Sequence, residues 1–206
     1  MQPVSEILPH SRVIPANACR RERWRNGLGW TREVLSGSIA GPPDDAGWDW
    51  RLSIAEIEAE AAYSRFEGVD REQMLLSGSG LRLIRAGGDT LLMPPHERVR
   101  FSGEEEMTAQ PVDGRVEVVN LMWRRDRVEV ASWHRPLVGP MVIFAEPRST
   151  WAVHLIAGQA RFDDDSGLPP LASGDTAIFA AGDARLRHVL DGGGEAWLIR
   201  LAARVQ

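Results

Sequence analysis

The stretch LLSGSG at residues 75–80 resembles LIAGQA at residues 155–160, an offset of 80 positions. A second pair follows in the same order, because GDTLLMPP at 88–95 resembles GDTAIFAA at 174–181, an offset of 86. The six extra residues fall where DDDSGLPP at 163–170 indicates a longer hairpin loop. Two pairs of similar segments in register predict that the chain contains two similar halves.

Short apolar runs bounded by glycine, proline and aspartate recur along the chain, and long helical patterns are hard to find. In WDWRLSIAEI at residues 48–57, the apolar Trp50, Leu52 and Ile54 alternate with other residues. This two-residue period is typical of a strand with one face inward, although the residues that follow are good helix formers. The rhythm of the whole chain predicts an all-β sandwich or barrel.

Composition limits the partners that we expect. A chain of 206 residues with 43% hydrophobic content can fill the core of one large or two small domains. A formal net charge of -5 argues against nucleic-acid binding, which requires concentrated positive charge. No stretch approaches the roughly 20 apolar residues of a membrane span, and residues 1–13 lack the pattern of a signal peptide. We therefore expect a cytoplasmic protein that binds neither nucleic acid nor membranes.

A strand that ends in glycine, then a hairpin, then Gly-Asp before another apolar strand is the pattern of a cupin jelly roll. The chain therefore resembles a bicupin, which implies two jelly-roll barrels in one all-β chain with little helix. We expect residues 1–135 to form the first cupin half and residues 136–206 to form the second half, packed on the first as one compact unit.

Most cupins bind a metal through a His-x-His pair, a glutamate and a further histidine, and this chain lacks these residues at the matching positions. Aligned on the strand-end glycines, Arg71 and Trp151 stand at the glutamate position, and Val99 and Arg185 stand at the last histidine position. First-row metals need converging imidazole and carboxylate ligands, and the single Cys19 excludes a cysteine-rich zinc site. We expect neither a metal nor another cofactor. The five histidines are scattered singly: His10, His96, His134, His154 and His188.

Five blocks of sequence resemble, in order and spacing, the HutD/Ves family of bicupins, which is named for its link to bacterial histidine utilisation. The resemblance is strongest over residues 8–130, and the second half matches more by architecture than by motif. The blocks are WRNGLGWTREV at 24–34, WRLSIAEI at 50–57, YSRFEGVDR at 63–71, LLSGSGLRLI at 75–84 and VEVVNLMWRRD at 116–126.

The resemblance carries a set of residues over to this chain. Three positions depart from the family pattern, because Leu28 replaces a glycine, Arg25 stands for lysine and Val118 replaces the aspartate before Asn120. Losing that carboxylate removes a possible charge partner for an arginine, so a ligand could be bound differently here. Twelve positions keep the family residue type: Trp24, Asn26, Gly27, Gly29, Thr31, Glu33, Arg51, Ser53, Phe66, Arg71, Asn120 and Met122.

These residue types suit a pocket for a small molecule that bears a carboxylate or an amide. Arg51 offers five donors in a fork that matches a carboxylate, and Ser53 lies on the same strand face. Asn120 offers both a donor and an acceptor, and a glycine lets backbone N–H groups approach a ligand. The predicted ligand-binding residues are Trp24, Asn26, Gly27, Thr31, Arg51, Ser53, Phe66, Arg71 and Asn120.

Structural explanations compete with this hypothesis. Arg51 with Glu33, or Arg71 with Asp70, could form ion pairs, because buried charges need partners. Asn26-Gly27 is also a common turn dipeptide.

Three functions remain open. The first is a metal-free bicupin that binds a small acidic metabolite, in a regulatory or buffering role. The family resemblance points to a histidine-degradation intermediate such as N-formimino-glutamate. The second is a metal-independent isomerase or hydrolase with Glu33 as general base and Arg51 or Arg71 stabilising an anion. The third is a structural or interaction module, for which a homodimer is one option.

Overall fold

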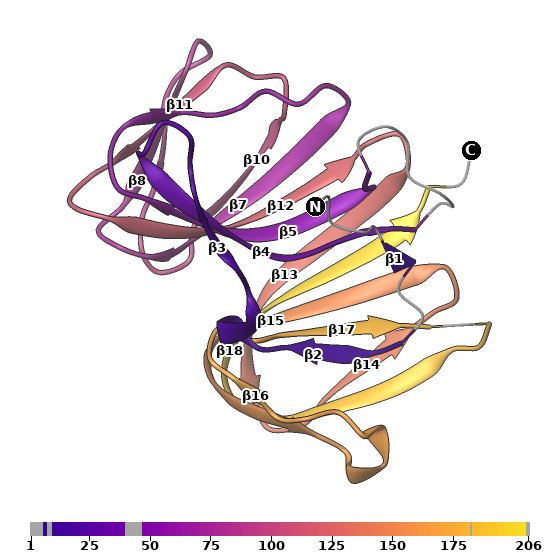
Figure 1. The fold of residues 1–206 in the computed structure, drawn as a ribbon. Helices are drawn as coiled ribbons and strands as arrows, with labels where there is room; N and C mark the ends of the chain where they lie inside the picture. Colours follow the sequence, from indigo (N-terminus) through magenta and orange to yellow (C-terminus); the bar gives the residue numbers. More distant parts are fainter. Residues whose placement is uncertain (1–5, 8–9, 40–46, 182, 205–206) are drawn as a thin grey trace. The chain divides into compact units, whose positions relative to one another are not determined.

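Figure 1 shows the computed structural model of the chain, in which nearly all regular structure is strand. Within the described ranges, the helical segments are two 3-10 helices of three residues each, Ala16–Ala18 and Asp164–Ser166. The all-β prediction is confirmed. The structure describes residues 6–7, 10–39, 47–181 and 183–204.

The chain forms two compact units, which we call the N-terminal and C-terminal cupins. The N-terminal cupin takes in residues 20–36 and 50–126, and the C-terminal cupin takes in residues 1–19, 37–49 and 127–206. Each unit is a β jelly roll, so the bicupin prediction is confirmed. The sequence predicts the border between the two halves after residue 135. In the structure, residues 127–206 belong to the C-terminal cupin, together with two segments from near the N-terminus, residues 1–19 and 37–49.

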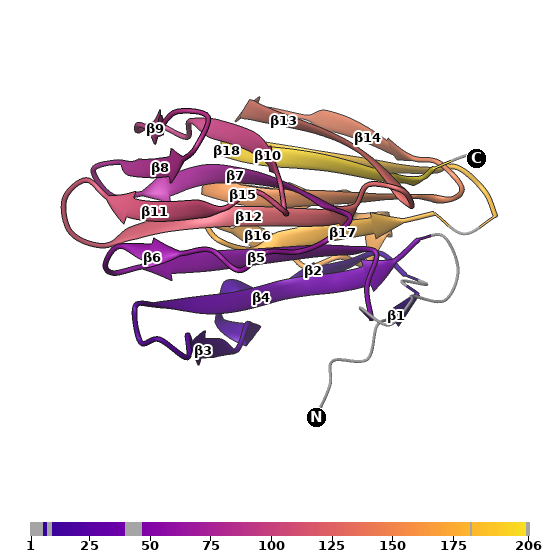
Figure 2. The same ribbon diagram turned by 90° about the horizontal axis from the view of Figure 1, so that it is seen from above.

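Two sheets form the N-terminal cupin, and Figure 2 shows β3, β4 and β5 following one another at one edge. In the larger sheet, β4 (Gly29–Ser38), β5 (Trp50–Ile57), β12 (Val116–Arg124), β7 (Val69–Ser77) and β10 (Arg98–Ser102) follow one another in that order, and β3 (Arg21–Arg23) pairs with β4. The smaller sheet consists of β6 (Ala61–Ala62), β11 (Met107–Pro111), β8 (Leu81–Arg85) and β9 (Thr90–Leu92), in that order.

The core of the N-terminal cupin follows from strand alternation. On β5, residues 51, 53, 55 and 57 share one face because successive side chains point to opposite sides. Ala55 pairs with Val118 on β12, and Val118 pairs with Leu75 on β7, so these side chains form a row across three strands. All three are buried and belong to one apolar cluster. Val118, which stands where the family pattern has aspartate, is thus an ordinary core residue here.

The C-terminal cupin is held together by two long strands, β15 (Ser149–Phe162) and β18 (Leu186–Ala203), which pair along most of their length. Its interior is apolar, with Phe162, Phe179 and Leu190 in one cluster. Its sheet has the order β13 (Val128–Val138), β18, β15, β17 (Thr176–Ala180) and β2 (Arg12–Ile14). In addition, β14 (Met141–Ala145) pairs with β18, β16 (Leu171–Ala172) with β15, and β1 (Glu6–Ile7) with Gly37 and Ser38.

The glycines of the internal repeat adopt matching backbone conformations. Gly78 and Gly158 have φ of +106° and +97°, and Gly88 and Gly174 have φ of +112° and +88°. Such left-handed values favour glycine because it has no Cβ. The extra residues of the second copy lie in the connection between β15 and β16, at 163–170, as the sequence predicted.

Among the described residues, the structure contains no helix with the length and apolar character needed to cross a membrane.

A cluster of charges holds the loop that runs from β6 to β7. The N–H of Gly68 donates to Glu104 Oε1 at 2.7 Å, and Arg125 Nη2 donates to Glu104 Oε2 at 2.6 Å. Arg125 also contacts Asp70 Oδ1 at 2.8 Å. Hydrogen bonds from Arg125 and Ser102 keep the pKa of Glu104 well below its usual range. The cluster anchors the segment that carries Phe66.

Replacing Glu104 tests this cluster. A carboxylate with a lowered folded-state pKa stabilises the protein above its unfolded pKa of 4.5, and this contribution is lost as the pH falls. We expect Glu104→Gln to lower the free energy of unfolding at neutral pH by on the order of 1 kcal/mol, since solvent screens the partly exposed pair. Urea denaturation between about pH 6 and pH 3 should show a smaller loss of stability for Glu104→Gln than for the wild type. The exposed Glu106→Gln serves as control, and equal pH dependence in all three proteins would contradict the assignment.

Candidate functional site

A pocket of about 440 Å³ lies in the N-terminal cupin, a size that suits a small metabolite. Eight of the nine predicted ligand-binding residues line it, and Gly27 does not. Their role in ligand binding stays a prediction. The lining residues are Trp24, Arg25, Asn26, Thr31, Arg51, Ser53, Ala55, Ala62, Tyr63, Ser64, Phe66, Arg71, Gln73, Asn120 and Met122.

Strand register brings the polar floor of the pocket together. One row across β5, β12 and β7 consists of Ser53, Asn120 and Gln73. The next row consists of Arg51, Met122 and Arg71. These rows continue the face on which Ala55, Val118 and Leu75 lie, so the same face changes from apolar core to polar floor along the strands. The pocket begins where that change occurs.

Arg71 is the central charge of the site. Its side chain is buried, with 7% of the residue exposed, and its Nη2 and Nε donate to Asn120 Oδ1 at 3.1 and 3.4 Å. The guanidinium lies 4.7 Å from the ring centre of Tyr63 and 5.0 Å from that of Phe101, which are cation–π distances. Burial lowers the pKa of Arg71, yet an arginine stays protonated in proteins. Among the described residues, no carboxylate forms an ion pair with it.

Asp70 is not the partner of Arg71. The sequence left that ion pair open, and it is wrong because adjacent residues on a strand point to opposite faces. Asp70 instead contacts Arg125 Nε at 2.8 Å. The hydrogen-bond acceptor for Arg71 is therefore the neutral amide oxygen of Asn120 and not a carboxylate.

Arg51 does form the ion pair that the sequence offered as an alternative. Its Nε lies 2.7 Å from Glu33 Oε2, and Ser36 Oγ donates to Glu33 Oε1 at 3.0 Å. Both oxygens of Glu33 are thus engaged, and Glu33 does not line the pocket. Within the described residues, the terminal amino groups of Arg51 make no hydrogen bond, so they remain able to contact a ligand.

The tight turn between β3 and β4 supplies one wall. Trp24 Nε1 donates to Thr31 Oγ1 at 2.8 Å, and Asn26 Oδ1 accepts from the N–H of Leu28 at 3.0 Å. A Cβ at Gly29 would clash with the carbonyl oxygen of Glu56 and would lie 3.0 Å from the Trp24 ring, so glycine lets both groups approach the backbone here. Gly27 has a φ of +72° and turns the chain.

Seven lining residues are outside the predicted ligand-binding set, and two of them, Tyr63 and Gln73, contact each other through polar groups. Tyr63, the only tyrosine, comes from the connection after β6, and its hydroxyl lies 2.9 Å from Gln73 Nε2. Desolvation raises the pKa of Tyr63, whereas the charge of Arg71 lowers it. Strand alternation could have found Gln73, which lies two residues after Arg71 on the same face. No local pattern signals Tyr63, because a connecting segment carries it.

The lining of this pocket does not suit a transition metal. Among the described residues, the lining includes no histidine, cysteine, aspartate or glutamate, whereas such metals require imidazole, thiolate or carboxylate ligands. Three arginines line it instead, namely Arg25, Arg51 and Arg71. Guanidinium groups bind anions and repel cations.

A family model described as HutD matches residues 16–198. This chain belongs to the HutD family. An uncharacterised 21.2 kDa protein in the hutC 3′ region of Pseudomonas putida is 35% identical over 115 residues, which is 56% of this chain and 59% of that protein. Protein Ves of Cronobacter sakazakii is 35% identical over 105 residues, or 50% of this chain and 55% of Ves. The chain thus spans less than two thirds of these relatives.

A solved structure shows the same fold over almost the whole chain. HutD from Pseudomonas fluorescens SBW25, in a formate condition, has a TM-score of 0.81 and 23% identity, and the match covers 95% of this chain and 100% of that chain. The resemblance to the HutD/Ves family inferred from the five sequence blocks is therefore confirmed.

Arg71→Met should separate stability from binding in this HutD family member. Replacing a buried, incompletely compensated charge with an apolar side chain of similar length is often neutral or stabilising. We expect the free energy of unfolding of the ligand-free variant to be unchanged or higher by about 1 kcal/mol in urea denaturation. Arg125→Met, which leaves Glu104 without its ion-pair partner, should be less stable than the wild type. A loss of more than about 2 kcal/mol in Arg71→Met would identify Arg71 as a structural residue.

Proposed function

We propose that this protein binds a small carboxylate-bearing metabolite in the pocket of the N-terminal cupin, without a metal and without turnover. The observation that supports this most strongly is Arg71, a buried cation that lines the pocket and has no carboxylate partner among the described residues. A buried charge is costly unless it is paired. A ligand carboxylate would supply the missing negative charge.

The surrounding residues suit such a ligand. Arg71 and Asn120 would donate to the carboxylate, because arginine offers a fork of donors and the Asn120 amide nitrogen is a further donor. The aromatic Trp24 and Phe66 would pack against the carbon skeleton of the ligand. The outward amino groups of Arg51 could reach a second oxygen-bearing group.

The identity of the metabolite is proposed from family membership. The matching family model is described as HutD, and one relative is a protein of the hutC 3′ region. These names support a histidine-degradation intermediate as the ligand. N-formimino-glutamate has two carboxylates, and three arginines line the pocket. We propose a regulatory or buffering role, in which the protein holds the intermediate. The cytoplasmic location expected from the sequence stays a prediction.

The geometry favours binding over the isomerase or hydrolase alternative. A general base must reach the proton that it removes. Glu33, the base suggested from the sequence, lies outside the pocket lining and has both oxygens occupied by Arg51 and Ser36. Its position supports a role in orienting Arg51. A homodimer or another interaction partner stays a prediction.

A ligand screen by thermal shift and calorimetry tests the proposal. The panel contains N-formimino-glutamate, N-formyl-glutamate, other histidine-pathway intermediates and simple dicarboxylates. A specific ligand should raise the melting temperature with concentration, because it binds the native state alone. Arg71→Met should abolish the rise, and Arg51→Ala should weaken binding by about 2 kcal/mol through loss of a charge-assisted contact.

The matched control is Arg82→Ala, which removes an exposed arginine outside the pocket and should leave binding unchanged. The proposal fails if no carboxylate stabilises the folded wild-type protein, or if Arg71→Met binds as tightly as the wild type.

A further inference from the structure

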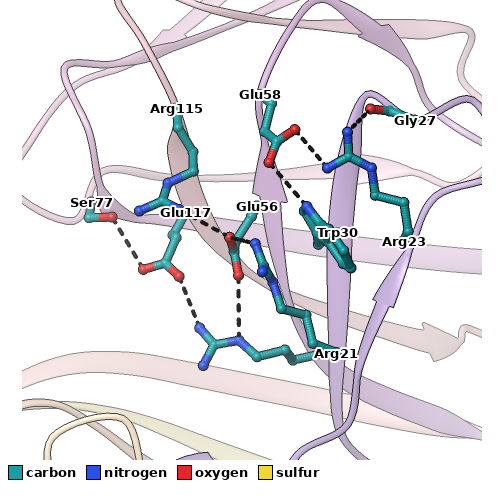
Figure 3. Close-up of polar contacts among 10 residues, drawn as sticks. Arg21, Arg23, Gly27, Trp30, Glu56, Glu58, Ser77, Arg115 and Glu117 are labelled. Atoms are coloured by element: carbon teal, nitrogen blue, oxygen red, sulfur yellow. Dashed lines mark hydrogen bonds and ion pairs between the residues drawn. The ribbon is translucent and has the colours of Figure 1, made fainter.

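Glu58 lies outside the pocket but contacts the turn that forms its wall. It follows β5 directly, and its Oε2 accepts from Arg23 Nη1 at 2.8 Å while its Oε1 accepts from Trp30 Nε1 at 3.0 Å. Its backbone N–H donates to the carbonyl of Leu28 at 3.0 Å. Figure 3 shows the two side-chain contacts converging on Glu58. The residue that directly follows β5 therefore contacts β3, β4 and the turn between them.

Arg23 extends this contact to the tip of the turn. Its Nη2 donates to the carbonyl of Gly27, as Figure 3 shows. The turn is closed from within by hydrogen bonds of Trp24, whose N–H donates to Gly29 O at 3.0 Å and whose carbonyl accepts from Gly27 N–H at 3.0 Å. Glu58, Arg23 and the backbone of the turn thus form one connected set of hydrogen bonds.

Further charged residues, Arg21 and Glu56, lie beside the contacts of Glu58 with Arg23 and Trp30. Trp30 lies between two guanidinium groups, with Arg21 at 4.0 Å and Arg23 at 4.7 Å from its ring centre. The buried Glu56 accepts from Arg21 Nη2 at 2.5 Å, and Figure 3 draws this contact beside the contacts of Glu58. On β4, Trp30 and Thr31 are adjacent and point to opposite faces. Thr31 lines the pocket, so the contacts of Trp30 lie on the other side of the hairpin.

Apolar packing fixes only part of the turn, because Trp24 packs against the apolar cluster of the N-terminal cupin. Arg25 and Asn26 are exposed, although both line the pocket. Segments with few buried apolar contacts open at low free-energy cost. Polar contacts at the base of the turn therefore contribute to holding the exposed part of the wall, Arg25 and Asn26.

We propose that Glu58 is a positioning residue that sets the Trp24–Asn26 wall of the pocket from outside it. The proposal rests on the proposed function in that the wall contacts a bound carboxylate ligand. When Glu58 is absent, Arg23 loses its ion-pair partner and Trp30 loses its acceptor. The wall then moves more freely, and a bound ligand leaves faster.

The charge state of Glu58 agrees with this role. Desolvation raises the pKa of Glu58, but the hydrogen bonds from Arg23 and Trp30 outweigh it, so the pKa lies below its usual value. Glu58 is therefore a carboxylate at neutral pH and pairs with Arg23.

The test uses Glu58→Ala and Glu58→Gln, with Glu60→Ala as the matched control. Glu60 is an exposed carboxylate two positions away, and its side chain accepts from Gln110 Nε2 at 2.8 Å, on β11 and not on the hairpin. Two quantities are measured for each full-length protein. One is the indole N–H signal of Trp24 in a ¹⁵N NMR spectrum, assigned with Trp24→Phe, and the other is the dissociation rate of N-formyl-glutamate.

We expect Glu58→Ala to shift the Trp24 indole signal, to speed its hydrogen exchange and to raise the dissociation rate about tenfold, with little change in the association rate. Glu58→Gln keeps an acceptor for Trp30 and should be intermediate, whereas Glu60→Ala should match the wild type. A residue that only stabilises the fold would lower the melting temperature without moving the Trp24 signal of the folded protein. Glu58→Gln also decides the question if Glu58→Ala does not fold.

The two proposals fail in distinguishable ways. If the wild type binds no carboxylate of the panel, the proposed function fails, and the Trp24 signal alone decides the role of Glu58. An unchanged Trp24 signal in the folded Glu58 variants overturns the positioning role, whether or not a ligand binds. A shifted signal with wild-type dissociation of N-formyl-glutamate also overturns it, because the wall would then not control the ligand.

Discussion

The burial of Arg71 is the constraint around which the site is organised. Only 7% of Arg71 is exposed, and its guanidinium stays charged and contacts the amide of Asn120 and the faces of Tyr63 and Phe101. Neutral oxygens and aromatic faces compensate a buried charge only in part. Such a cation, lining a pocket with two further arginines, gives the pocket an excess of positive charge. The chemistry of the pocket follows from this one residue more than from any other.

The two cupins use the corresponding position differently. Where many cupins have a metal-binding glutamate, the N-terminal cupin has Arg71 and the C-terminal cupin has Trp151. Arg71 keeps a polar pocket, whereas Trp151 stacks on Trp133 with ring centres 5.7 Å apart at the edge of an apolar core. The same fold therefore carries an arginine-lined pocket in one half and aromatic packing at the corresponding position in the other.

A few residues around the β3–β4 turn both line the pocket and bind the turn to the neighbouring strands. Alternate residues of the hairpin face opposite sides, so Thr31 faces the pocket while Trp30 joins the charged network of Figure 3. Gly29 allows the Trp24 ring to approach the backbone. This explains why arginine, tryptophan, asparagine and glycine are crowded into so short a stretch: the turn must line a pocket on one side and bind the sheet on the other.

The sequence by itself determined the all-β class, the internal repeat and eight of the lining residues. Strand periodicity is local, so alternation placed Arg51 and Ser53 on one face without knowledge of the fold. Only the tertiary structure decided that Arg71 contacts Asn120 and not Asp70, that Tyr63 joins the pocket and that Glu58 holds the turn. It also decided that β2 pairs with β17, far along the chain. These contacts join residues distant in sequence, and no local pattern specifies which strands pair or which connecting segment closes over them.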